Sequence, residues 1–138
     1  MPIDPEIVIA KARELLKVPF VVYGRTKRGV DCLGVVIWVG KEVGGLPEDF
    51  HMEPYTYPPK PQLWEQYFPQ YFDECDVEPG AVLIVRKHPN GSPRHCYFIG
   101  ANAQTVIGMD EALARLWVTE TRLNDDIRAR IWKCYRFK

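Results

Sequence analysis

Cysteine and histidine, two residue types that can act together in covalent catalysis, each occur at a suggestive place in this chain. Cys32 directly precedes an apolar stretch, residues 33–39, that suits a buried helix. A thiol at a helix start faces unpaired backbone N–H groups and the positive end of the helix dipole, which favour the thiolate. Cys32 is therefore a candidate nucleophile. The alternative is a small buried apolar side chain, since free cysteine is among the most buried residue types.

A cysteine nucleophile needs a base, and the chain offers three histidines. Histidine suits this role because its ordinary pKa of about 6.5 allows proton exchange near neutral pH. His51 falls in a proline-rich segment and His88 lies beside a turn, where solvated histidines are common. His95 begins a β-rich run, so a sheet would fix its side chain and aim it at a helix packed across that sheet. We take His95 as the candidate base, with a structural strand histidine as the alternative.

The helices that would position Cys32 are expected in the first half of the chain. Asp4 is a typical N-cap and Pro5 a typical first helical residue, which predicts a helix over residues 5–17. A second helix should start at Asp31 and Cys32 and stop at the glycine pair 44–45. Residues 46–61 are rich in proline and predict a surface loop over the core. Aromatic residues at i and i+4 then predict a helix over residues 63–72, which Pro69 should kink or end.

The second half of the chain has a different pattern, typical of antiparallel strands. Residues 81–87 and 95–100 are β-rich and flank a Pro-Asn-Gly-Ser-Pro turn, which predicts a hairpin. We expect a third strand over residues 104–108, a short helix over 110–117 and a last strand over 129–137. Helices first and antiparallel strands second make an α+β fold.

Length and charge limit the functional classes. The chain has 138 residues, which predicts one domain spanning residues 1–138. Eighteen basic residues balance eighteen acidic residues, so no overall field attracts nucleic acid or a membrane surface. The acidic, proline-containing N-terminus is unlike a secretory signal, and we expect no export. The cysteines form no close pair of the kind that zinc sites use, so we expect no metal, no cofactor and free thiols at Cys32, Cys75, Cys96 and Cys134.

Three segments carry a resemblance to a known family. Residues 23–36 read Tyr-Gly-Arg-Thr-Lys-Arg-Gly-Val-Asp-Cys-Leu-Gly-Val-Val, residues 78–83 read Glu-Pro-Gly-Ala-Val-Leu, and residues 95–100 read His-Cys-Tyr-Phe-Ile-Gly. The first resembles the active-site segment of NlpC-type cell-wall cysteine peptidases, most closely the phage-encoded branch, in which Tyr and Gly precede an Asp-Cys-Ser/Leu-Gly motif. The other two resemble the family's Pro-Gly-Asp strand start and its His-Val-Gly-Ile-Tyr strand. The resemblance spans roughly residues 5–137 and implies a papain-like fold.

The resemblance also implies roles for individual residues. Cys32 would attack the substrate carbonyl, and its backbone N–H would help to hold the oxyanion. His95 would take the thiol proton and later protonate the leaving amine. Tyr23 would contact the substrate or the oxyanion. Asp31 would bind an amine of the substrate, or would equally serve as an ordinary N-cap.

The chain departs from the family pattern at the residue that orients the histidine. Family members place a polar residue about twelve positions after it, whereas counting from His95 reaches Ile107. Gln104 and Asp110 are the nearest polar candidates, and each also fits an ordinary surface position. Loss of the orienting group lowers the rate in related triads by orders of magnitude without abolishing the chemistry.

The implied function is that of a phage or prophage cysteine endopeptidase that hydrolyses an amide bond in peptidoglycan stem peptides, of the γ-D-glutamyl-diamino acid type. Such a protein would reside in the host cytoplasm before assembly or lysis, or in the virion tail with tail proteins as partners. Two alternatives stay open: a noncatalytic structural or binding module of the tail, which the missing residue favours, and an amidase or acyltransferase on another substrate. The basic residues Arg25, Lys27 and Arg28 are expected to form a solvated loop rather than a phosphate site.

Overall fold

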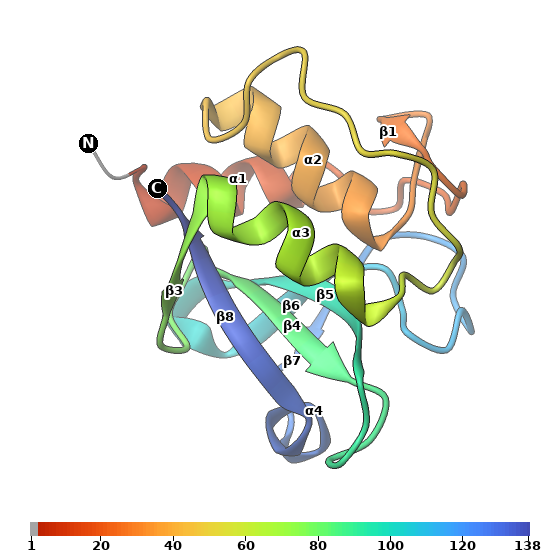
Figure 1. Ribbon diagram of the computed structural model, residues 1–138. Helices are drawn as coiled ribbons and strands as arrows, with labels where there is room; N and C mark the ends of the chain where they lie inside the picture. The colour runs from red at the N-terminus through yellow and green to blue at the C-terminus, as the bar shows by residue number, and fades with distance from the viewer. Residues whose placement is uncertain (1–2) are drawn as a thin grey trace.

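The computed structural model describes residues 3–138, and an antiparallel sheet forms its centre. The sheet has six strands in the order β3-β8-β4-β5-β6-β7 (Figure 1). All neighbouring strands are antiparallel. The strands are β3 (Phe72–Cys75), β4 (Val82–Arg86), β5 (Pro93–Ile99), β6 (Thr105–Gly108), β7 (Thr119–Arg122) and β8 (Ile131–Phe137). A separate two-stranded ribbon, β1 (Arg25–Thr26) and β2 (Gly29–Val30), forms within the predicted basic loop.

Helices cover both faces of this sheet unequally. Three helices pack on one face and enclose the larger core: α1 (Pro5–Arg13), α2 (Cys32–Val43) and α3 (Pro61–Tyr71) (Figure 1). The short α4 (Asp125–Ala129) lies on the other side, where Leu123 and Ile127 close a smaller core. The predicted α+β fold, with N-terminal helices packed on an antiparallel sheet, is confirmed. None of the helices within residues 3–138 is long and apolar enough to span a membrane.

The first helix is shorter than the sequence predicts. Asp4 caps it as expected, accepting a hydrogen bond from Glu6 N at 2.9 Å. The helix ends at Arg13 rather than Lys17, because the chain tightens into i to i+3 turns, such as Leu16 N to Arg13 O. Lys17 N then donates to Val118 O. A contact to a distant segment has replaced the last helical turn.

The second helix forms where the sequence places it, and its start is fixed by close packing. It begins at Cys32 after the N-cap Asp31 and ends at Gly44, which adopts φ +79°. Gly34 is required on the first turn because a Cβ there would lie 2.1 Å from Gly24 O. The loop before the helix therefore packs directly against the turn that carries Cys32.

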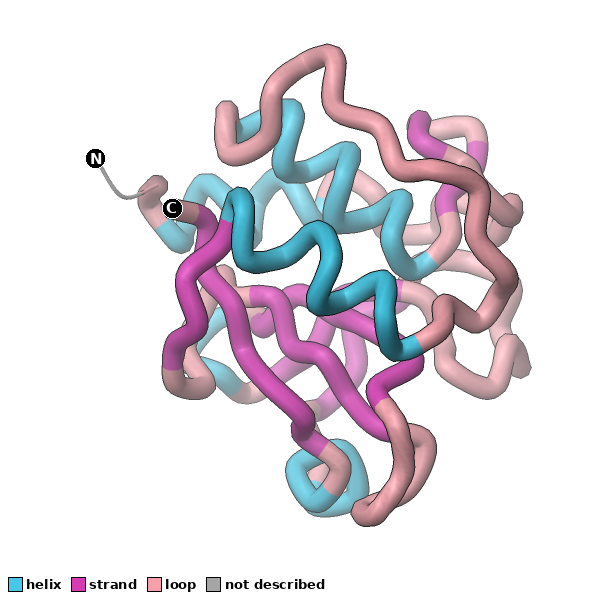
Figure 2. The backbone as a smooth tube through the Cα atoms, in the orientation of Figure 1, coloured by secondary structure: helices cyan, strands magenta, loops and turns pink. Residues whose placement is uncertain are grey.

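Residues 46–60 form the predicted loop, which contains no helix or strand. It leaves the C-terminal end of α2, runs back along that helix and enters α3 (Figure 2). Two of its own side chains, Phe50 and Tyr55, are buried in the main core. Of the two effects predicted for Pro69, ending the helix does not occur, because α3 continues past it to Tyr71.

The hairpin β4–β5 carries His95 and contains an irregularity next to it. Val85 lies opposite His95, but Arg86 lies opposite Pro93, so Arg94 is an extra residue on β5. This is a β-bulge, which ends the regular register at His95.

The predicted helix over residues 110–117 was wrong. The Asp110 carboxylate instead accepts hydrogen bonds from the backbone N–H groups of Ala112, Ala114 and Arg115, which holds this segment in turns. The sequence also did not predict β3, β7 or α4, and the last strand begins at Ile131 rather than Ala129.

Candidate active site

Cys32 is the first residue of α2, and its side chain is almost completely buried, with 1% exposed. The Asp31 carboxylate before it accepts a hydrogen bond from Gly34 N at 2.7 Å, which satisfies one of the free N–H groups at the helix start. The remaining N–H groups and the helix dipole face the thiol. The helix therefore presents the sulfur at its electropositive end, as the sequence predicts.

His95 lies on β5 and is likewise buried, with 3% exposed. Its Nε2 is 2.8 Å from the carbonyl oxygen of Met109, directly after β6. Because a carbonyl only accepts hydrogen bonds, Nε2 must carry the proton, which leaves Nδ1 free to accept one. The Met109 carbonyl thus fixes both the ring orientation and the tautomer of His95.

The two side chains interact and shift each other's pKa. Burial opposes ionisation of Cys32, but a hydrogen bond with the Cys96 thiol, together with the charge and hydrogen bond of His95, lowers the pKa of Cys32 to about 5. Burial likewise opposes protonation of His95, but the charge and hydrogen bond of Cys32 and the charge of Glu111 raise the pKa of His95. Near pH 6 the pair is therefore a thiolate and an imidazolium, the reactive form of a cysteine nucleophile.

Cys96 is a third member of this cluster. Its Sγ lies 3.3 Å from the carbonyl oxygen of Cys32. It follows His95 on β5 and is buried in the same core as Cys32. Burial and the neighbouring Cys32 raise the pKa of Cys96 well above its ordinary value. Cys96 therefore stays a neutral donor while Cys32 ionises.

A charged network stands behind the histidine. Glu111 forms two hydrogen bonds of 2.8 Å with Arg130 and accepts a third from the Tyr97 hydroxyl at 2.9 Å. The Tyr97 ring packs edge-on against His95, with 4.7 Å between the ring centroids. Burial would raise the pKa of Glu111, but the Arg130 hydrogen bonds and the charge of His95 hold it below its usual value. A fixed negative charge therefore favours the imidazolium form of His95.

Asp31 is fully buried, and its carboxylate is saturated with donors. Beyond Gly34 N, it accepts hydrogen bonds from Tyr23 N at 2.9 Å and the Tyr55 hydroxyl at 2.6 Å, and Arg25 lies at 3.3 Å. A carboxylate offers about four acceptor positions, so none is left for a substrate amine. Of the two roles that the sequence offers for Asp31, the structure shows the N-cap of α2.

Tyr23 lies beside this cluster with 47% of its surface exposed. Its hydroxyl donates to the carbonyl oxygen of Tyr55, and the two rings pack edge-on at 4.8 Å. Arg25, expected in a solvated loop, instead donates to the Tyr55 hydroxyl at 2.8 Å. The ring of Tyr23 is accessible to a ligand, but its hydroxyl is already used within the protein.

The remaining candidates lie away from the pair. His51 and His88 are exposed, and Gln104 is an exposed residue after a short 3-10 turn. The Asp110 carboxylate binds the turn that follows it. Neither polar candidate orients His95, because the backbone carbonyl of Met109 does so. A backbone carbonyl leaves no mark on the side-chain sequence, so this partner could not be found there.

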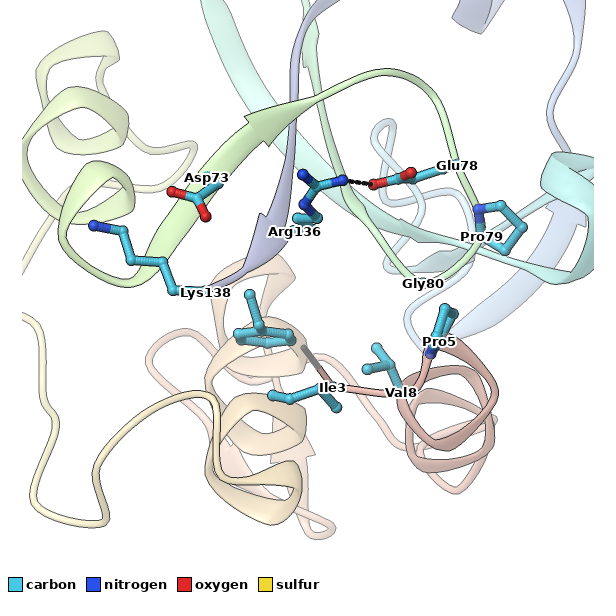
Figure 3. Close-up of a pocket in the computed structure, with 10 residues that line it drawn as sticks. Ile3, Pro5, Val8, Asp73, Glu78, Pro79, Gly80, Arg136 and Lys138 are labelled. Carbon is cyan, nitrogen blue, oxygen red and sulfur yellow. Dashed lines mark hydrogen bonds and ion pairs between the residues drawn. The ribbon is translucent and has the colours of Figure 1, made fainter. Parts of the chain in front are cut away.

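A large surface hollow, of about 690 Å³, does not coincide with these residues. It lies between the start of α1 and the ends of β3 and β8, where Arg136 and Glu78 form an ion pair of 3.2 Å (Figure 3). It contains no cysteine or histidine. The chemistry is therefore expected at the start of α2, and not in this hollow.

Comparison with known proteins gives matches in structure only. Neither the protein-family models nor the curated proteins match this sequence. An NlpC/P60 family protein from Bacillus cereus ATCC 10987 matches over 99% of this chain with a TM-score of 0.70 and 16% identity. The NlpC/p60 domain of the peptidoglycan hydrolase SagA matches over 96% of the chain with a TM-score of 0.63 and 16% identity.

The chain has an NlpC/P60 fold. It spans 41% of the length of the Bacillus cereus protein and 97% of the SagA domain. The fold expectation drawn from residues 23–36 and 95–100 is thereby confirmed. At 16% identity the NlpC/P60 likeness describes architecture, and the chemistry rests on the residues of this chain.

Proposed function

We propose that this protein is a cysteine endopeptidase that hydrolyses an amide bond in peptidoglycan stem peptides. The observation that carries the proposal is the pairing of a low-pKa thiol, Cys32, with a buried histidine whose Nε2 is fixed by Met109 O. The NlpC/P60 fold and the description of SagA as a peptidoglycan hydrolase support the substrate class.

The reaction follows from the geometry of the pair. Cys32 Sγ attacks the carbonyl carbon, and the carbonyl electron pair moves to oxygen. The oxyanion accepts a hydrogen bond from the backbone N–H of Cys32 at the helix start. His95, protonated by the thiol, gives that proton to the leaving amine. Water then hydrolyses the thioester with His95 as base, which returns the thiol.

The finer substrate assignment rests on the sequence resemblance. The Tyr-Gly and Asp-Cys-Leu-Gly motifs within residues 23–36 resemble the phage-encoded NlpC-type peptidases. This supports cleavage of the γ-D-glutamyl-diamino acid bond by a phage or prophage protein, with Tyr23 at the substrate. Phage tail proteins are the partners that fit this assignment, with residence in the host cytoplasm before assembly and in the virion tail afterwards.

A second candidate function is a noncatalytic binding module. The observation that favours it is the burial of Cys32 and His95, at 1% and 3% exposed, because a substrate carbonyl must reach the sulfur. Under the catalytic proposal, the side chains that cover Cys32 move aside when substrate binds.

Hydrolysis of purified muropeptides, followed by mass spectrometry, tests the proposal. The wild type should release fragments cleaved after γ-D-glutamate, and Cys32→Ala should release none. The free energy of unfolding of Cys32→Ala should stay within about 1 to 2 kcal/mol of wild type, since a single sulfur atom is removed. Cys75→Ala is the matched control and should keep full activity.

Three results would contradict the proposal. If the wild type cleaves no muropeptide between about pH 5 and pH 9, the noncatalytic module is the better assignment. Hydrolysis of simple amides alone would favour an amidase. Unfolding of the Cys32→Ala variant would show that the thiol serves packing.

A further inference from the structure

The hydroxyl of Tyr57 is a buried donor that the protein itself does not use. Its oxygen is inaccessible to solvent and has no hydrogen-bond partner of good geometry among residues 3–138. Buried polar groups are nearly always paired, so an unpaired one calls for a specific explanation. A frequent explanation is that a ligand supplies the missing partner.

Tyr57 lies at the candidate active site. Tyr57 packs against the buried core that contains Cys32. Burial and then the charge of Cys32 raise the pKa of Tyr57. Its ring packs against Phe20, with 5.2 Å between the ring centroids. Two residues earlier, Tyr55 is anchored to Asp31 by a hydrogen bond of 2.6 Å. These contacts hold the 46–60 loop against the start of α2, the helix turn that carries Cys32.

We propose that the Tyr57 hydroxyl donates a hydrogen bond to the substrate carbonyl oxygen as that oxygen becomes negative during attack by Cys32. The inference rests on the proposed function, because it assigns an oxyanion donor to the same reaction. It makes Tyr57 a catalytic residue supplied by the loop, in addition to the backbone N–H of Cys32.

The chemistry requires a donor that keeps its own proton. When the Cys32 sulfur bonds to carbon, the π electrons of the carbonyl move to oxygen, and Tyr57 stabilises that charge without transferring a proton. The tyrosine stays protonated throughout the working range because its pKa lies above the ordinary value of 10. Tyr23 is less suited to this role, since its hydroxyl already donates to Tyr55 O.

The first test compares hydrolysis by Tyr57→Phe and by wild type. The substitution keeps the ring against Phe20 and removes only the hydroxyl. Loss of one oxyanion donor lowers kcat by about 100-fold in comparable sites, and we expect a decrease of that order with KM within about threefold. Tyr71→Phe is the matched control, because Tyr71 packs on Phe50 in the same core and lies outside the site.

The second test does not depend on peptidoglycan. The Cys32 thiol adds to the carbonyl carbon of the aldehyde N-acetylalaninal and forms a hemithioacetal. The oxygen of this adduct occupies the oxyanion position. Binding of the aldehyde is measured as protection of Cys32 from iodoacetamide. Tyr57→Phe should weaken this protection by about tenfold, whereas Tyr71→Phe should not change it.

The two tests separate failure of the inference from failure of the proposed function. Unchanged aldehyde protection in Tyr57→Phe would overturn the inference and leave Tyr57 as a packing residue, whatever the muropeptide result. Suppose that the wild type cleaves no muropeptide and that aldehyde protection is weaker in Tyr57→Phe than in wild type. This result would overturn the proposed substrate and retain Tyr57 as the oxyanion donor. A larger KM with an unchanged kcat would also count against the inference.

Discussion

Two thiol environments, one at the start of α2 and one on strands β3 and β8, differ in the groups that surround the sulfur. Cys75 on β3 and Cys134 on β8 lie directly opposite one another, near the acidic residue Glu78. Burial, and then the hydrogen bond and charge of Glu78, raise the pKa of Cys75 to about 12. Burial and the charges of Glu78 and Asp76 raise the pKa of Cys134 to about 11.

Cys32 is more deeply buried than Cys75, yet its pKa falls to about 5. Burial disfavours the thiolate at all three positions, so it cannot explain the difference. The neighbours do: the hydrogen bond of the Cys96 thiol, and then the charge and hydrogen bond of His95, lower the pKa of Cys32 and outweigh the Asp31 carboxylate. At Cys75 and Cys134 the neighbouring carboxylates raise the pKa further. The neighbouring groups, and not burial, therefore decide which thiol ionises.

Replacing His95, the cation beside Cys32, should reduce the pKa difference between Cys32 and the other thiols most strongly. In His95→Gln the thiolate loses its imidazolium partner and the leaving amine loses its acid. We expect hydrolysis to fall by about 10²- to 10⁴-fold. The midpoint of Cys32 alkylation should move from about 5 towards the ordinary value of about 8.5. A midpoint that remains near 5 would show that His95 is not needed and that the Cys96 hydrogen bond and the helix end lower the pKa. His88→Gln is the control, since His88 is exposed and outside the site.

Alkylation of the wild type should reveal the difference between thiols directly. At pH 6 Cys32 is largely thiolate and Cys75 is not, although a lower pKa also makes a thiolate less nucleophilic. Together these effects predict that Cys32 reacts with iodoacetamide about 1,000-fold faster than Cys75. The burial of Cys32 reduces this ratio, because the reagent must reach the sulfur. Peptide mapping after timed labelling measures the ratio.

Labelling in denaturant is the matched control, because all four cysteines should then react at similar rates. A native protein in which Cys75 reacts first would contradict the assignment of Cys32 as the activated thiol.

Removing the negative charge of Glu111 should have a smaller effect, which should lower the hydrolysis rate only at alkaline pH. In Glu111→Gln the charge that faces His95 is lost, so the pKa of His95 should fall. The imidazolium would then deprotonate at lower pH, and hydrolysis at pH 8 should decrease several-fold while the rate at pH 6 changes little.

Asp126→Asn is the matched control for this change. Asp126 also contacts Arg130, at 3.1 Å, but is not among the main causes of the raised pKa of His95. It should leave the pH profile in place. A shift of equal size in both variants would mean that Arg130, rather than the charge of Glu111, controls the profile.

The smallest effect should come from the neutral donor. Cys96→Ala removes the hydrogen bond that helps to lower the pKa of Cys32, while the His95 charge remains. The midpoint of Cys32 alkylation should rise by about one pH unit, less than in His95→Gln. Cys134→Ala removes a buried thiol of the other region and should cause no shift. A fall in the midpoint would contradict the role of Cys96 as donor.

The elements that the sequence predicts best are those with local signals. The N-cap Asp31 and the stop at Gly44 define α2, and the Pro-Asn-Gly-Ser-Pro turn defines the β4–β5 hairpin. The missed elements lack such signals. β7 is a polar edge strand that pairs through its backbone with β6, and α4 has only five residues, too few for a helical period.

The candidate site was predictable in part for the same reason. Residue type and element start single out Cys32 and His95. The other contributors depend on long-range packing: Met109 acts through its backbone, Tyr57 comes from a loop without periodicity, and Glu111 acts through charge. Cys96 follows His95 directly in the sequence, yet only its contact with Cys32 reveals a role.

The β-bulge at Arg94 has a consequence for how the sequence can vary. Between Val82 and Val85 the strand register to β5 is regular, and it ends at His95. The extra residue separates this regular ladder from the 87–92 turn. Insertions or deletions in that turn can therefore be absorbed beyond the bulge, without moving His95 relative to Met109 or to α2. The length of the hairpin turn can therefore vary while the position of the His95 imidazole is preserved.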